Sequence, residues 1–142
     1  MGPLQLDQYT FSKLCVETNF GHKPETLAPM VNVQIQAGLG PVVGAENKYQ
    51  VMLELSSLRA PDGTGTLPYE VTFQVVGQFS VLDPSYNDKE KLVRINGTSI
   101  LYSAAREMVL LVTGRGPWGP YQLPTVNFQT LSQQAAAPAV LG

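Results

Sequence analysis

The sequence has few charged side chains. Lys and Arg number 9, Asp and Glu number 11, and together they are 14% of 142 residues, against about 25% in an average soluble protein. Hydrophobic residues still make up 44%. A monomer of 15.4 kDa exposes roughly 7,200 Å², which leaves about 360 Å² to each charge. We therefore expect a surface rich in uncharged polar groups, or one that is hidden in an oligomer or binds something apolar.

The low basic charge, the lack of long apolar runs and the single cysteine argue against several classes of protein. A net charge of −2 and a pI near 5.3 argue against a nucleic-acid binder, which carries a basic face. No apolar run approaches 18 residues, so we expect no insertion into a membrane. Residues 1–20 lack a basic stretch followed by an apolar one, so we expect no signal peptide. The single cysteine, Cys15, cannot form an internal disulfide, which fits the cytoplasm.

Groups for catalysis or for holding a cofactor are also scarce. The only histidine, His22, lies in a Gly-His-Lys-Pro turn and is typical of an exposed loop residue. Cys15 lies in a strand pattern without an activating partner, and zinc needs about four ligands. Gly38, Gly40 and Gly44 imitate a phosphate loop, but their spacing is wrong and a strand follows instead of a helix. We predict no enzyme, no cofactor and no metal.

Four segments have the composition or the alternation of strands: 8–20, 30–37, 49–56 and 68–76. The first changes phase near Leu14, which predicts a bulge. A glycine-rich loop is expected over 38–48. Gly77 permits a bend or bulge after the fourth strand.

One long helix is predicted after a charged stretch at 83–94. It spans about 99–113, capped by Thr98 or Ser99, and is apolar on more than one side, so we expect it to be buried on more than one side. A short helix could follow from Asn127 to about Ala135. Strands followed by helices indicate an α+β fold with a four-stranded antiparallel sheet and one long and one short C-terminal helix. We treat 1–142 as one domain, with a core at about 8–131 and a flexible tail at about 135–142.

The stretch from Asn96 to Phe128 resembles the C-terminal half of the protein-export chaperone SecB family. The matching residues of the helix and of the passage after it are Ile100, Leu101, Tyr102, Ala105, Arg106, Glu107, Arg115, Gly116, Pro124, Val126, Asn127 and Phe128. More weakly, 9–20 resembles the family's long first strand, and 69–81 its fourth strand with the Gly-x-Phe-Ser segment.

The resemblance implies a homotetramer, built as a dimer of dimers with the long helices between the dimers. It also implies an ATP-independent cytoplasmic holdase that binds non-native polypeptides, mainly exported precursors, and passes them to the SecA motor. Two departures are visible. Ser103 or Ala104 stands where the family's helix usually has proline, and the tail after Leu131 lacks the charges of export members. A SecB-like chaperone dedicated to an antitoxin, or a structural adaptor without a client, remains an alternative.

Three sets of candidate site residues follow. Candidates for binding clients, each with local core packing as the alternative, are Val42, Val43, Tyr69, Val71, Phe73, Val75, Phe79, Trp118 and Tyr121. Candidates for the interface between subunits are Leu101, Ala105, Arg106, Met108 and Val112. An acidic outer face of the sheet that could meet SecA comprises Glu17, Glu54 and Glu70, which could equally be a merely solvated face.

Overall fold

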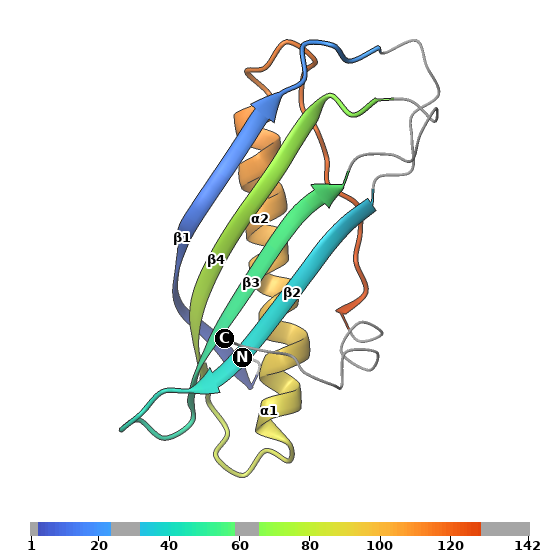
Figure 1. Cartoon of the computed structure of the whole chain (residues 1–142). Helices are drawn as coiled ribbons and strands as arrows, with labels where there is room; N and C mark the ends of the chain where they lie inside the picture. The colour runs from blue at the N-terminus through green and yellow to red at the C-terminus, as the bar shows by residue number, and fades with distance from the viewer. Residues whose placement is uncertain (1–2, 24–31, 59–65, 129–142) are drawn as a thin grey trace.

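The computed structural model describes residues 3–23, 32–58 and 66–128. Its centre is a four-stranded antiparallel sheet (Figure 1). The strands lie in the order β1 (Leu4–Thr18), β4 (Tyr69–Val81), β3 (Lys48–Leu58) and β2 (Asn32–Pro41). The predicted fold class, a four-stranded antiparallel sheet with a long helix behind it in sequence, is confirmed.

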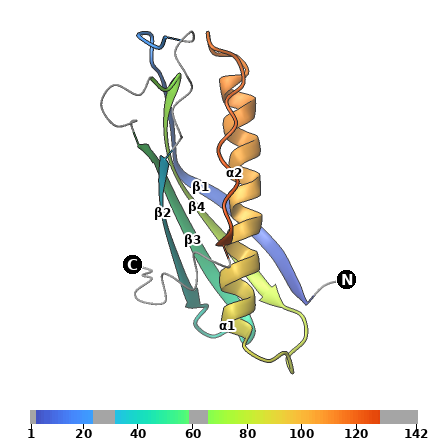
Figure 2. The same ribbon diagram turned by 90° about the vertical axis from the view of Figure 1, so that its right-hand side faces the viewer.

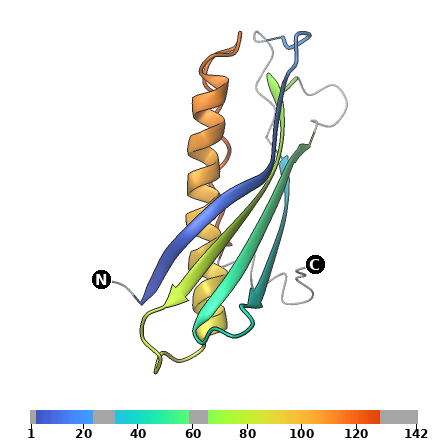
Figure 3. The same ribbon diagram turned by 90° about the vertical axis from the view of Figure 1, so that its left-hand side faces the viewer.

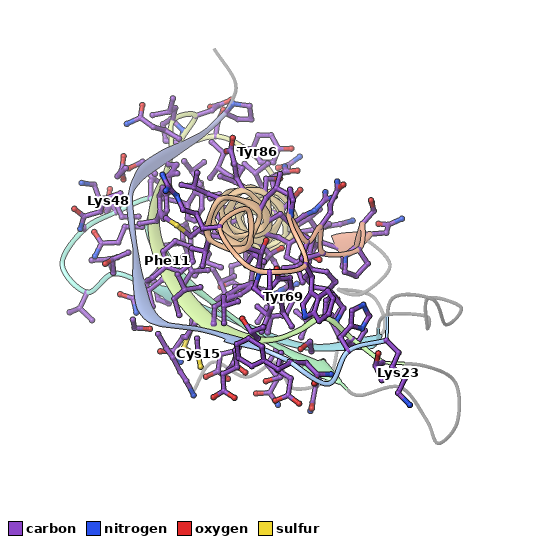
Figure 4. The ribbon with its side chains drawn as sticks, turned by 90° about the horizontal axis from the view of Figure 1, so that it is seen from above. Phe11, Cys15, Lys23, Lys48, Tyr69 and Tyr86 are labelled. Atoms are coloured by element: carbon purple, nitrogen blue, oxygen red, sulfur yellow. The ribbon has the colours of Figure 1, made fainter. Side chains whose placement is uncertain are left out.

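The alternation in the sequence sets the two faces of the sheet. Along β4 the side chains alternate between buried and half-buried without interruption, as a strand requires because successive side chains point to opposite faces. The inner, buried face lies under the helix, and the outer face is polar (Figure 4). Phe11 of β1 points towards the helix, whereas Cys15 lies on the other side of the same strand. The predicted bulge in β1 is confirmed, since its register against β4 shifts at Asp7 and at Ser12.

Strand ends differ from the predicted ones. β1 begins at Leu4, and β2 continues to Pro41 through what was predicted as loop. β4 passes through Gly77 without a bend and ends at Val81. Gly77 has another role, because a Cβ there would lie 2.7 Å from Cδ2 of Leu101 and 3.0 Å from the ring of Phe79. Its missing side chain is what lets the helix approach the sheet.

The helical segment begins ten residues before the predicted start. It comprises α1 (Lys89–Leu92), a π-helical turn η1 (Val93–Gly97) and α2 (Thr98–Thr113). Asp88 caps its start, accepting a hydrogen bond from the backbone N–H of Lys91 at 3.1 Å. The predicted cap at Thr98 or Ser99 is wrong. Thr98 is buried inside the helix, and its hydroxyl donates to the carbonyls of Arg94 and Ile95.

After α2 the chain turns back and runs beside the helix (Figure 2). This return segment, residues 114–128, buries Leu123 and Phe128 in the core. The hydroxyl of Tyr102 donates to the carbonyl of Pro124 and so ties the segment to α2. The helix lies across the inner face of the sheet, with β1 passing along its flank (Figure 3). The short helix predicted from Asn127 and the tail at 135–142 fall almost wholly beyond Phe128, outside the described residues.

Candidate functional site

The loop after α2 is anchored by one tyrosine hydroxyl from the sheet. Tyr69, the first residue of β4, is 1% exposed. Its hydroxyl accepts from the backbone N–H of Trp118 at 3.1 Å and donates to the carbonyl of Gly119 at 2.9 Å. A Cβ on Gly116 would overlap that hydroxyl. Glycine at 116 is therefore required for the loop to close over Tyr69.

Trp118 is joined to the end of β1 in the same region. Its indole N–H donates to the carbonyl of Asn19 at 2.9 Å, and its ring meets the ring of His22 edge to face at 5.1 Å. Asn19 in turn donates through its amide to the carbonyl of Leu67, and through its backbone N–H to that of Pro68. The start of β4, the end of β1 and the loop after α2 thus form one cluster.

Most of the predicted client-binding residues on β4 lie in the core. Tyr69, Val71, Phe73, Val75 and Phe79 are each at most 1% exposed. The fourth strand was predicted to end at 76, short of Phe79, which is wrong, because β4 continues in register past Gly77. Within one protomer these five side chains fill the space under α2 and leave no groove open to a client.

The other client-binding candidates are accessible to different degrees. Val43, in the turn between β2 and β3, is 97% exposed, and Val42 is half-buried. Trp118 and Tyr121 are half-buried, and both face the cluster around Tyr69. Burial raises the pKa of Tyr121 above its ordinary value, and its hydroxyl has no hydrogen-bond partner in the part of the chain described.

Helix α2 has one face towards the sheet and one away from it. Two of the predicted interface residues, Leu101 and Ala105, are fully buried within the protomer, so they present no accessible surface to a second subunit. Met108 and Arg106 are half-buried, with the Arg106 guanidinium 5.9 Å from the ring centre of Tyr102. Only Val112 of the predicted set is exposed.

A different set of apolar residues is exposed around the helix. We call this set the apolar strip, and it comprises Tyr9 and Leu14 of β1 with Ile100, Leu110, Leu111 and Val112 of α2. Each is more than a third exposed, and Leu111 reaches 71%. The sequence signal was available, because the helix was predicted to be apolar on more than one side, but its two apolar sides were not told apart.

The three glutamates of the predicted acidic face do share the outer face of the sheet. Glu17 of β1 stands directly opposite Glu70 of β4. Glu54 of β3 is opposite Gln74 and accepts a hydrogen bond from its amide at 2.7 Å. Lys13 lies on the same face, also opposite Gln74.

The two edges of the sheet differ in charge and regularity. β1 is bulged at Asp7 and Ser12 and also carries Lys13 and Glu17. The carboxylate of Asp7 accepts hydrogen bonds from Ser80 and Gln5, which lower its pKa. β2 pairs with β3 without a shift of register and contains no charged residue. Charges and bulges normally protect exposed strand edges from pairing with other chains, and within residues 32–41 β2 has neither, with Pro41 at its end as the one residue that disfavours pairing.

The described residues do not form a metal site. Groups of three or more His, Cys, Asp or Glu placed to hold a metal do not occur among the described residues. In the same residues, no helix is long and apolar enough to cross a membrane. What the described surface offers is a regular, uncharged strand edge, the exposed Val43 and the apolar strip.

This arrangement is that of the SecB-like chaperones. A SecB-like chaperone from Mycobacterium tuberculosis, solved with a peptide from an antitoxin, superimposes with a TM-score of 0.55 at 18% sequence identity, covering 87% of this chain and 91% of that one. The likeness extends to the sequence level in the curated relatives.

The protein-export protein SecB of Acidithiobacillus ferrooxidans is 33% identical over 111 residues, which cover 78% of this chain and 73% of the relative. That of Nitrobacter winogradskyi is 29% identical over 119 residues, covering 80% and 72%. The family profile described as preprotein translocase subunit SecB matches residues 9–139. The chain belongs to the SecB family, whose members are protein-export chaperones and not enzymes.

Proposed function

We propose that this chain is an ATP-independent cytoplasmic holdase that binds non-native polypeptides and keeps them competent for export. The observation that carries the proposal is the β2 edge. It is regular, uncharged and next to the exposed Val43. An extended client can add to such an edge through main-chain hydrogen bonds that do not depend on its sequence. Its apolar side chains can then add about 25 cal/mol for each Å² they bury.

The proposed working form is a homotetramer, a dimer of dimers. The apolar strip supports it, because its large apolar side chains are each more than a third exposed in the protomer, and an assembly would remove them from water. Arg106 and Glu107 are the only charged residues of α2, so the helix brings few charges into such an interface. Tyr69, Val71, Phe73 and Val75 support the site from beneath as the core on which the helix rests.

The export role requires delivery to SecA, and we propose the outer sheet face for that contact. Glu17, Glu54 and Glu70 share that face, and a basic partner surface would complement its carboxylates. A second candidate function is that of an antitoxin-dedicated chaperone, which is favoured by the structural similarity to a chaperone solved with an antitoxin peptide.

One experiment separates these functions. The protein is purified without nucleotide, its mass is measured by sedimentation, and it is added to an aggregating unfolded client such as α-lactalbumin freshly reduced with dithiothreitol. We expect a mass near four protomers and suppression of aggregation. A monomer without effect would refute the holdase. Proteins recovered with it from the native cytoplasm then decide between exported precursors with SecA and an antitoxin.

A further inference from the structure

A hollow lies at the start of the helical segment, where the linker from β4 meets α1 and η1. Its volume is about 400 Å³, within the range of sites that hold ligand side chains. Leu92 and Ile95 form its apolar floor, and the ring of Tyr86, 38% exposed, forms one wall. It lies at the end of the molecule where the helix begins, far from the loop that follows α2 (Figure 1).

The rim of this hollow carries exposed hydrogen-bonding groups that are accessible to a ligand. Asn87 comes from the linker and Asn96 from η1, so two carboxamides line one hollow from two elements. Neither side-chain amide makes a hydrogen bond within the described part of the chain, and the same is true of the Lys91 ammonium. The carboxylate of Asp88 does have a partner, since it accepts a hydrogen bond from the backbone N–H of Lys91.

The π-helical turn places part of this site. Ile95 and Asn96 are neighbours in η1, and both line the hollow. The Thr98 hydroxyl is hydrogen-bonded to the backbone of this turn, at the carbonyls of Arg94 and Ile95. Single π-helical turns of this kind are frequent at functional sites.

We propose that the hollow is a second contact for the client, which takes one apolar side chain of an extended polypeptide and the peptide groups beside it. A carboxamide has both a donor and an acceptor, which match the C=O and N–H of a peptide unit. The rim has one ammonium and one carboxylate, so it favours a neutral main chain over an anion. The inference rests on the proposed holdase function and names a site which that function did not include.

Helix α1, which carries part of the hollow, is also bonded to the turn beside the proposed edge site. The ammonium of Lys89, in α1, donates to the side-chain carbonyl of Asn47 at 2.6 Å. Asn47 closes the turn between β2 and β3 that carries the exposed Val43. A client that runs along β2 towards this turn therefore arrives at α1. A second contact there would lengthen the bound segment without adding any sequence requirement.

The test is the double variant N87A/N96A, bound to reduced, carboxymethylated α-lactalbumin. We expect the Kd to rise about tenfold, which corresponds to about 1.4 kcal/mol, with the assembly mass and the urea midpoint unchanged. The matched control is Gln50→Ala, which removes an exposed carboxamide from the outer face of β3. A second measurement uses Asn96→Cys with a photoreactive label, in a Cys15→Ser background, and should crosslink the client where Gln50→Cys does not.

The outcomes are distinct. If the unmodified protein does not bind this client, the holdase proposal itself fails. If it binds, and N87A/N96A binds equally well without a crosslink at 96, only the second contact is refuted. If the double variant changes the assembly mass instead of the Kd, the hollow is a contact between copies of the chain, and the inference is again overturned.

Discussion

The hydroxyl of Tyr69 accepts a hydrogen bond from the backbone N–H of Trp118, across 49 residues of sequence. The same hydroxyl donates to the carbonyl of Gly119. A single buried oxygen therefore fixes the loop after α2 to the first residue of β4. A core residue of the sheet in this way determines the position of a loop whose aromatic side chains were predicted to contact clients.

Replacing Tyr69 with Phe should release this loop. The change leaves the N–H of Trp118 without its partner, and an unsatisfied buried polar group costs about 1–3 kcal/mol. We expect the free energy of unfolding in urea to fall by that amount. Because Trp118 is the only tryptophan, its emission should shift to longer wavelength in the folded variant.

The control for this change is Tyr49→Phe. Tyr49 is half-buried, and its hydroxyl makes no hydrogen bond among the described residues. We expect less than about 0.5 kcal/mol of change there and an unchanged emission spectrum. Equal effects of the two variants would show that the Tyr69 hydroxyl does not hold the loop.

Gly77 should tolerate no side chain. In Gly77→Ala the new methyl group would meet Leu101 and Phe79, both fully buried. Overpacking of this kind costs about 1–3 kcal/mol. Gly40→Ala is the matched control in β2, because no atom lies within 4 Å of its Cβ position.

A second substitution can test the cause. Leu101→Val removes the δ-methyl group that a Cβ at Gly77 would touch first. The double variant G77A/L101V should therefore lose less stability than the sum of the two single variants, a coupling that urea unfolding can measure. Additive losses would mean that the close approach of helix and sheet is not the reason for glycine at 77.

Much of this fold could be predicted from the sequence, because alternation is a local property. The four strands and the helix from Thr98 onward follow from it directly. The start of the helix could not, since Lys89, Glu90 and Lys91 suggest a linker by their charge. Glu90 and Lys91 are exposed on the outer side of a turn whose inner side is Leu92, 7% exposed, and Val93, which is fully buried. Lys89 is half-buried and donates to Asn47.

The site was less predictable, because burial depends on contacts between distant segments. The predicted strand ended at 76, short of Phe79, and only the register with β3 shows that Phe79 belongs to β4 and lies in the core. Similarly, Leu101 and Leu111 are both leucines of one helix. Which of them faces the sheet is decided by the missing side chain at Gly77.

Alkaline pH should destabilise the protein through Tyr102. Desolvation raises the pKa of Tyr102 to about 12, and the nearby Arg106 charge opposes this only in part. The unfolded chain then releases the tyrosine proton near pH 10, while the folded chain still holds it. This contribution is complete below pH 10 and is lost as the pH rises through 12. We expect a loss on the order of 1 kcal/mol between pH 9 and pH 11.

The variant Tyr102→Phe isolates this contribution. It removes the hydrogen bond to Pro124, so it should be less stable at pH 8 by about 1 kcal/mol. Its stability should nevertheless fall less steeply above pH 9, because one titrating group is gone. Parallel curves of unfolding free energy against pH for the two proteins would contradict the assignment to Tyr102.

Leu111→Glu should disrupt the assembly and leave the protomer folded. Leu111 is 71% exposed in the single chain, so the substitution removes little from the protomer's core and costs it little stability. In the proposed tetramer it places a charge in an apolar contact, where an unpaired charge is strongly unfavourable. Sedimentation should show a mass below that of four protomers, with an unchanged circular dichroism spectrum.

Two further variants serve as controls for Leu111→Glu. Leu101→Glu, at a site that is fully buried within the protomer, should abolish folding instead of dividing the assembly. Val43→Glu, in the turn between β2 and β3, should leave the mass unchanged and weaken client binding, because Val43 belongs to the proposed edge site. If Leu111→Glu keeps the mass of the unmodified protein, the apolar strip is not the contact between subunits. The strip would then be a surface for clients, and the loss of client binding in Leu111→Glu would show it.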